Sequence, residues 1–114
     1  MQDLHAKQDM EVWLDIAAGY IYHSDLRNFQ SHFGVSPNIM EVIWQLLMAE
    51  HWPIVFKRIH LLWILHFLKC YPLQDVGASF CQVDHKTWHK WVWLTIIALY
   101  HTLHLVIINI KLFE

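Results

Sequence analysis

The chain has 114 residues, of which 56% are hydrophobic, and a formal net charge of −2 at pH 7. This length is that of one small domain or of a fragment of a larger one. The charge balance excludes a uniformly basic surface, and so much apolar surface needs burial in a core, a partner or a membrane. Gly and Pro are scarce, with three of each. Few helix breakers and long apolar stripes predict an all-α fold.

The first predicted helix covers residues 10–22, after a polar and frayed start over residues 1–8. Its apolar residues recur at three- and four-residue steps, which is the pattern of an amphipathic helix. Ser24 is placed to cap a short second helix with an apolar stripe. That helix contains Phe33 and is expected to end at Gly34.

Ser36 and Pro37 stand in the favoured order for the start of a third helix, a capping residue followed by Pro in the first turn. We expect this helix to continue until shortly before Pro53. Residues 59–70 are apolar on nearly every side, which predicts a central helix beneath the next motif. At about 12 residues this helix is too short to span a bilayer, which needs roughly 20.

Residues 73–92 have the pattern of a helix-turn-helix, with a short helix, a tight turn and a second helix. Asp84 is placed to cap the second helix, because its carboxylate can accept from the free N–H groups of the first turn. We expect Ala78 to be the close-contact residue between the two helices and Val83 to fix their angle. Gln82 stands where such a turn usually has Gly, at a left-handed backbone cost on the order of 1 kcal/mol.

The second helix of this motif has a predicted buried edge formed by Trp88, Trp91 and Val92,. Four basic or titratable side chains then point outward, namely His85, Lys86, His89 and Lys90. In a DNA-binding helix-turn-helix such positions meet base edges and phosphates in the major groove. A plain helical hairpin with a solvated basic face fits the same pattern.

Charge is unevenly distributed along the chain. Residues 1–50 carry seven acidic and two basic side chains, whereas residues 51–110 carry five basic and two acidic ones. The helix-turn-helix therefore lies in the locally basic part, which is enough for weak phosphate attraction but not for tight binding by a lone monomer. Arg58 and Lys69 are plausible further phosphate contacts near the motif.

The C-terminal part is a long apolar run. Leu105 to Ile110 is rich in β-branched residues, which predicts a strand, with an extension of the preceding helix as the alternative. A strand without a partner in the chain would be the entry to a second domain. Residues 91–112 are also long enough for a transmembrane helix. Polar side chains within that run, including His101 and His104, are costly in hydrocarbon and oppose a membrane span.

Other chemistry-bearing residues form no recognised motif. Cys70 and Cys81 show no CxxC spacing and no secretory leader precedes them, so we expect reduced thiols in an intracellular protein. Ten His include pairs at helical spacing, but no Cys, Asp or Glu completes a metal-ligand set, so no metal and no cofactor is predicted. Phosphate loops and the familiar hydrolase signatures are absent.

The predicted organisation has three parts: an N-terminal helical region over residues 1–53, the helix-turn-helix region over 54–100, and an apolar tail over 101–114. Phe33-Gly34-Val35-Ser36 and Cys81-Gln82-Val83-Asp84 share an apolar residue, a turn residue, Val and a helix cap. The turns lie 83 − 35 = 48 residues apart. Two tri-helical units of one type would explain this match, although two copies are too few to establish a repeat.

The run HLLWILHFLKCYPLQDVGASFCQVDHKTWHKWVWL, from His60 to Leu94, resembles the N-terminal region of eukaryotic DDE-superfamily transposases of the Harbinger type. Stretches similar to Phe33-Gly34-Val35-Ser36-Pro37 and to Asp84-His85-Lys86-Thr87-Trp88-His89-Lys90-Trp91 recur there in this order. Val106-Ile107-Ile108-Asn109 resembles the strand that enters their catalytic domain. The resemblance covers roughly residues 29–109 in patches, and Gly77 stands where the family pattern has an apolar residue.

This resemblance implies transposon-end DNA binding by a helical region that precedes a ribonuclease-H-like nuclease. Such a nuclease needs three carboxylates to hold two divalent metals. After Val92 the only acidic residue is Glu114, so the catalytic carboxylates are missing, no enzyme activity is expected, and the apolar tail would be the start of an absent catalytic domain.

The sequence thus predicts a small all-α domain with a helix-turn-helix that binds double-stranded DNA in the nucleus, as a truncated, transposase-like protein. The expected DNA contacts are His85, Lys86, His89, Lys90, Arg58 and Lys69. No small-molecule substrate is expected, and exposed apolar surface offers a route to homo-oligomers. Two alternatives remain open: a single-pass membrane protein with a C-terminal apolar helix, and a helical protein-interaction module.

Overall fold

The computed structural model describes residues 2–112 and, within them, the side chains of residues 7–104. The described chain is a compact all-α globule without strands, which confirms the predicted fold class. Its six helices are α1 (Gln2–Ala17), α2 (Leu26–Phe33), α3 (Pro37–Met48), α4 (Arg58–Cys70), α5 (Gln74–Phe80) and α6 (His85–Leu112).

Two predicted boundaries in the N-terminal region are wrong. The first helix already begins at Gln2 and ends at Ala17 rather than at residue 22. The cap of α2 is Asp25 instead of Ser24, because the Asp25 carboxylate accepts from the backbone N–H of Asn28 at 2.8 Å. The Ser24 hydroxyl instead donates to the backbone carbonyl of Leu14 and so fastens the loop to the last turns of α1.

Of the two forms predicted for residues 105–110, the strand is wrong and the helix extension is confirmed. Residues 105–110 continue α6, which runs without a break for 28 residues. A strand needs a neighbour to satisfy its backbone groups, and the described chain contains no other strand. A helix satisfies these groups within itself, so the β-branched residues extend the helix that precedes them.

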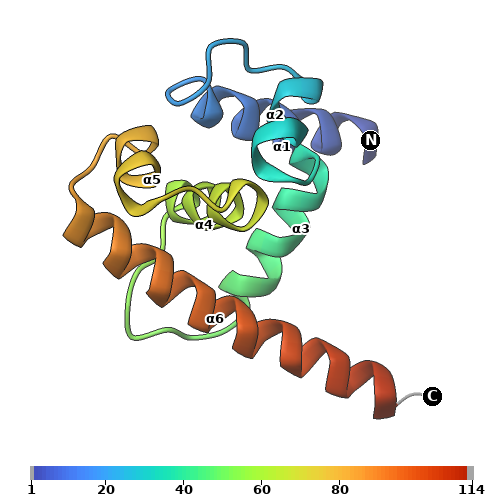
Figure 1. Ribbon diagram of the computed structural model, residues 1–114. Coiled ribbons are helices and arrows are strands. Elements are labelled where there is room, and N and C mark those ends of the chain that lie inside the picture. Colours follow the sequence, from blue (N-terminus) through green and yellow to red (C-terminus); the bar gives the residue numbers. More distant parts are fainter. Residues whose placement is uncertain (1, 113–114) are drawn as a thin grey trace.

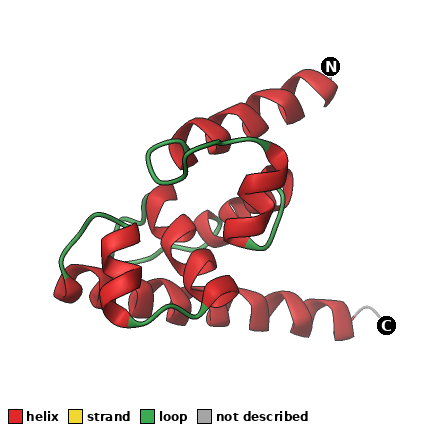
Figure 2. Ribbon diagram, turned by 45° about the horizontal axis from the view of Figure 1, so that its top comes forward, coloured by secondary structure: helices red, strands yellow, loops and turns green. Residues whose placement is uncertain are grey.

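The helices are arranged on two sides of α4, which lies at the centre (Figure 1). Figures 1 and 2 show α1 on one side of the molecule and the long α6 on the opposite side, with α4 between them. α1 packs against α3, α2 packs against α4, and both α4 and α5 pack against α6. Figure 2 also shows the loops that join successive helices.

The centre of the core is α4, as its sequence predicts. Leu61, Leu62 and Ile64 are fully buried, and Trp63 nearly so. One continuous cluster of buried apolar residues extends from Trp13 on α1 to Leu99 on α6. A helix that is apolar all round lowers the free energy of the folded state most when neighbours cover every face, and here α2 and α6 flank α4.

Two histidines of α4 are buried and stack on aromatic rings. The His60 ring lies parallel to Trp91 at 3.8 Å between centroids, and the His66 ring lies parallel to Phe80 at the same distance. Burial, with a smaller effect of Lys57 on His60 and of His32 on His66, lowers the pKa of each imidazole to about 4. Both rings are therefore neutral parts of the core at pH 7.

The two turns that match in sequence also match in conformation. Gly34 and Gln82 both have a left-handed backbone, with φ of 82° and 60°. Two residues later, Ser36 and Asp84 each accept a hydrogen bond from a backbone N–H of the following helix, at 3.3 Å and 3.0 Å. The same local design thus connects α2 to α3 and α5 to α6.

Candidate nucleic-acid interface

The start of α6 is held by a cap and a strained turn. The Asp84 carboxylate accepts from the backbone N–H of Thr87 at 3.0 Å, and hydrogen bonds from Thr87 lower the pKa of this exposed carboxyl. Gln82 adopts the left-handed conformation predicted for the turn, which costs a non-glycine residue about 1 kcal/mol. The sequence therefore correctly predicted where α6 begins and what its cap is.

The close contact between α5 and α6 is made by Gly77, and this corrects the choice of Ala78. A Cβ atom on Gly77 would lie 2.5 Å from Cζ2 of Trp88, a separation that carbon atoms do not reach without strain. Ala78 is buried beside it, but the indole ring of Trp88 occupies the space where a Gly77 side chain would be. Gly77 thus allows the backbone of α5 to lie directly on the largest side chain at the start of α6.

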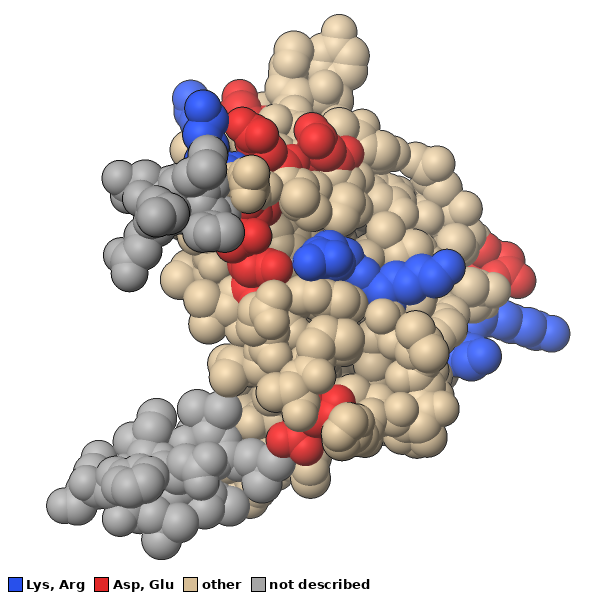
Figure 3. Space-filling view, turned by 180° about the vertical axis from the view of Figure 1, so that it is seen from behind, with Lys and Arg blue, Asp and Glu red and all other residues tan. Residues whose placement is uncertain are grey.

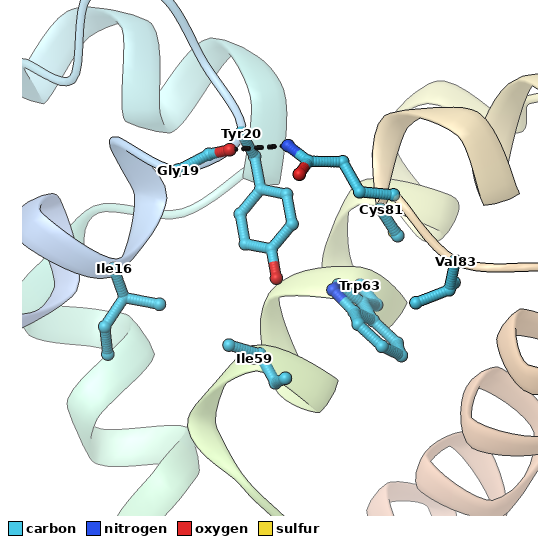
Figure 4. A pocket seen from close by; sticks show the side chains of 8 residues that line it. Ile16, Gly19, Tyr20, Ile59, Trp63, Cys81 and Val83 are labelled. Atoms are coloured by element: carbon cyan, nitrogen blue, oxygen red, sulfur yellow. Dashed lines mark hydrogen bonds between the residues drawn. The ribbon is translucent and has the colours of Figure 1, made fainter.

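Figure 4 shows how the strained turn at Gln82 makes a contact with a distant part of the chain. The Gln82 side-chain amide donates to the backbone carbonyl of Gly19 at 2.7 Å and so joins the α5–α6 turn to the turn that follows α1. Beneath this bond lies an open hollow of about 410 Å³, with Tyr20 pointing toward it from the turn after α1 and Trp63 from α4 (Figure 4). A glycine would relieve the strain at this position but could not make the bond.

The four predicted contact residues on α6 are brought together on one exposed face. His85, Lys86, His89 and Lys90 are all exposed, while Trp88 and Val92 on the opposite edge are buried. The His85 ring lies 3.2 Å from the carboxylate of Asp75 on α5. The Lys90 ammonium lies 5.3 Å from the centre of the Trp91 ring. Both lysines are thus available on the first turns of the helix.

Arg58 lies elsewhere and already has partners. Its guanidinium is 3.5 Å from the carboxylate of Glu41 and lies 5.7 Å and 5.1 Å from the ring centres of Trp13 and Trp44. The Glu41 carboxylate is buried and also accepts from the indole N–H of Trp13 at 3.2 Å. The structure therefore places Arg58 in a network that joins α1, α3 and α4.

Lys69 is separate from both groups. It is exposed on the last turn of α4, and its aliphatic stem packs beside Gly34, which ends α2. Figure 3 shows basic side chains in separate groups on the face that it draws, with acidic and uncharged residues between them. The predicted contacts thus divide into one cluster on α6 and two outlying residues.

An apolar part of the same exposed face of α6 was not foreseen. Trp93, Ile97, Tyr100 and Leu103 are each about half exposed or more, and they follow Lys86 and Lys90 along one side of the helix. Apolar hollows of about 220 Å³ and 270 Å³ flank this stretch. The exposed face of α6 therefore changes from basic to apolar near Trp93. The signal in the sequence was the charge-free run after Lys90, which was considered only as part of a possible membrane span over residues 91–112.

Two further features of the described residues bear on metal binding and on a membrane span. Among the side chains that the structure describes, no three His, Cys, Asp or Glu residues lie close enough together to hold a metal ion. No helix within the described residues is both long and apolar enough to cross a membrane. Residues 105–112 of the apolar run have side chains that lie outside the described ones.

No family model matches the sequence. No curated protein and no solved structure matches it either.

Proposed function

We propose that this chain is a helical DNA-binding domain that contacts duplex DNA with the first turns of α6 and has no nuclease activity of its own. The observation that carries the proposal is the α5–α6 corner. Contact between Gly77 and Trp88 brings the two helices close, and the outer face of α6 then presents two lysines and two histidines. A helix supported in this way can enter the major groove, which admits one α-helix.

The charge on this face suits phosphate and base contacts. Lys86 and Lys90 are four residues apart, so they stand on one side of α6 about 6 Å apart along its axis. His85 and His89 can each donate or accept a hydrogen bond when neutral. With two lysines and an overall charge of −2, binding by one copy is expected to be weak and strongly dependent on salt.

The resemblance to the N-terminal region of Harbinger-type transposases supports the same assignment, since the stretch from Asp84 to Trp91 carries both the resemblance and the exposed basic face. By that resemblance the protein would act in the nucleus, on double-stranded DNA. The carboxylates of the nuclease are not among the residues after Val92, where Glu114 is the only acid.

The test is fluorescence anisotropy of a labelled random-sequence duplex titrated with the protein at several salt concentrations. Lys86→Ala is expected to weaken binding severalfold and to reduce the slope of log K against log salt by about one unit, because one phosphate contact is lost. Lys7→Ala removes the same charge from an exposed site on α1 and is the matched control. It should leave both the affinity and the slope unchanged.

Equal losses for the two variants would show that only net charge matters and would contradict an interface on α6. An absence of binding by the unmodified protein at low salt would contradict DNA binding itself. A nuclease assay with Mg²⁺ on the same duplex should show no cleavage.

A second candidate function is protein interaction, including homo-oligomer formation, through the apolar part of α6. The specific observation in its favour is the row Trp93, Ile97 and Tyr100, with 50%, 61% and 74% of each residue exposed. Apolar surface of this kind between flanking hollows is typical of binding sites rather than of free surface. Light scattering during gel filtration distinguishes the cases, since Ile97→Lys would convert an oligomer to a monomer and leave a monomer unchanged.

A further inference from the structure

A second group of basic side chains lines a hollow between α2 and α4. The hollow has a volume of about 520 Å³ and is open to solvent. Its lining comes from two elements that are far apart in the sequence, with Arg27, Gln30 and Ser31 on α2 and Lys69 on α4. Leu26 completes the lining. Packing of α2 against α4 is what brings the two cations to one place.

Two like charges at one hollow raise the free energy of the folded state unless an anion reduces their repulsion. Neither Arg27 nor Lys69 forms an ion pair with a residue that the structure describes. The nearest acid in the sequence, Asp25, uses its carboxylate to cap α2 through the backbone N–H of Asn28. The charge of the hollow is therefore positive.

The remaining lining groups are suited to an oxyanion. Arg27 offers a planar fork of N–H donors, Lys69 a mobile ammonium, Ser31 a hydroxyl and Gln30 a side-chain amide. Together these groups can donate to several oxygens of one tetrahedral anion, as in phosphate recognition by arginine and lysine. A carboxylate has only two oxygens and would leave some of these donors without a partner.

The hollow is connected with the start of α6 through the end of α4. Phe67, two residues before Lys69, packs its ring against Trp88 with 5.7 Å between centroids. The aliphatic stem of Lys69 is held beside Gly34, so the position of its ammonium is restricted by the end of α2. Contacts to the DNA backbone from elements next to a recognition helix commonly fix its register in the groove.

We propose that Arg27, Gln30, Ser31 and Lys69 form a phosphate-binding site, and that it takes a backbone phosphate of the duplex that α6 contacts. The identity of the phosphate as DNA rests on the function proposed above, but the site itself does not. α2 thereby becomes part of the DNA-binding surface, although no DNA contact was predicted for this helix from the sequence.

The experiment compares the double variant Arg27→Gln/Lys69→Gln with the unmodified protein in two measurements. The first is the thermal unfolding midpoint in sodium phosphate against sodium chloride at equal ionic strength. The second is duplex affinity by fluorescence anisotropy across salt concentrations. Lys7→Gln/Lys57→Gln is the control, because it removes the same charge from two exposed residues outside the hollow.

We expect phosphate to raise the midpoint of the unmodified protein and of the control by more than that of the hollow variant, because a ligand stabilises only the state that binds it, while the general effect of phosphate as a salt is common to all three. We also expect the hollow variant to bind duplex severalfold more weakly, with a salt slope reduced by about one unit. Its loss should be the same for unrelated DNA sequences, since a phosphate contact carries no base specificity.

The outcomes separate the two proposals. A phosphate effect equal in all three proteins would overturn the site. A specific phosphate effect without any change in duplex binding would overturn the assignment to DNA and indicate a free or protein-borne phosphate group instead. If Lys86→Ala and the unmodified protein both fail to bind duplex while the phosphate effect persists, the proposed function fails and the phosphate site stands.

Discussion

At the scale of single residues, Gly77 shows how one missing side chain allows two helices to pack closely. The residue departs from the apolar pattern expected of the motif, yet the Trp88 ring fills the space beside it. A larger side chain at this position would have to displace either the Trp88 ring or the α5 backbone, and both are buried. The large indole ring of Trp88 thus fills the space that an apolar side chain at Gly77 would otherwise occupy.

Gly77→Ala is expected to destabilise the protein by about 1–3 kcal/mol, because the added Cβ would lie 2.5 Å from Trp88 Cζ2 and overpacking has costs of this size. The higher helix propensity of Ala offsets up to about 1 kcal/mol of this. Urea unfolding followed by circular dichroism measures the change. Gly19→Ala is the control, since its Cβ would meet only the Ile16 carbonyl at an ordinary 3.5 Å. Equal midpoints for both variants would contradict the tight contact.

At the scale of elements, a buried carboxylate joins three helices. Glu41 on α3 accepts from Trp13 on α1 and pairs with Arg58 at the start of α4, and the Arg58 guanidinium lies over two indole rings. Arg58, which was predicted from the sequence to contact DNA phosphate, is thus already paired within the protein. A charge that is partly desolvated and already paired is a poor phosphate contact, because binding DNA would require breaking the pair.

Glu41→Ala is expected to cost about 2 kcal/mol of stability, since it leaves the Trp13 N–H and the Arg58 guanidinium without their acceptor. The figure lies below that for a fully buried pair because the Arg58 side chain is 38% exposed,. Glu41→Gln keeps the shape and one acceptor, and we expect a smaller loss. Glu11→Ala, at an exposed site on α1, should change the urea midpoint little. A loss for Glu11→Ala as large as that for Glu41→Ala would argue against the network.

At the scale of the whole molecule, the core contains two neutral histidines that connect α4 to α5 and α6. His60 and His66 have pKa values lowered to about 4 by burial, whereas an unfolded chain has His pKa values near 6.5. Between these two pH values the unfolded state binds more protons than the folded state. These two histidines therefore lower the free energy of unfolding as pH drops from about 6.5 to about 4, and they contribute no pH dependence above that range.

The expected loss is at most on the order of 3 kcal/mol for each histidine, a large part of the stability of a small domain. Urea midpoints at pH 7.5, 6.5, 5.5 and 4.5 measure it. His66→Phe keeps a ring against Phe80 and should flatten the pH dependence, while His89→Gln, at an exposed site, should not. An unmodified protein with the same midpoint at pH 7.5 and 4.5 would show that neither histidine is held neutral.

The sequence alone determined that the fold is helical and where several of the helices begin or end. Caps and breakers act over three or four residues, so Gly34, Ser36, Pro37 and Asp84 could be assigned from their neighbours alone. Continuous apolar character identified α4 as the central helix, and helical spacing divided the start of α6 into a buried edge and an exposed basic face. These features depend on contacts within one or two turns, which the order of residues specifies directly.

Only the tertiary structure decided which residues meet across the chain. The pairing of Arg58 with Glu41, the place of Gly77 beneath Trp88 and the meeting of Arg27 with Lys69 all join different helices. The helical end of α6 also depended on the rest of the fold, because a β-branched run becomes a strand only where another strand can pair with it. Local patterns specify helices, but contacts between helices depend on how all of them pack around one core.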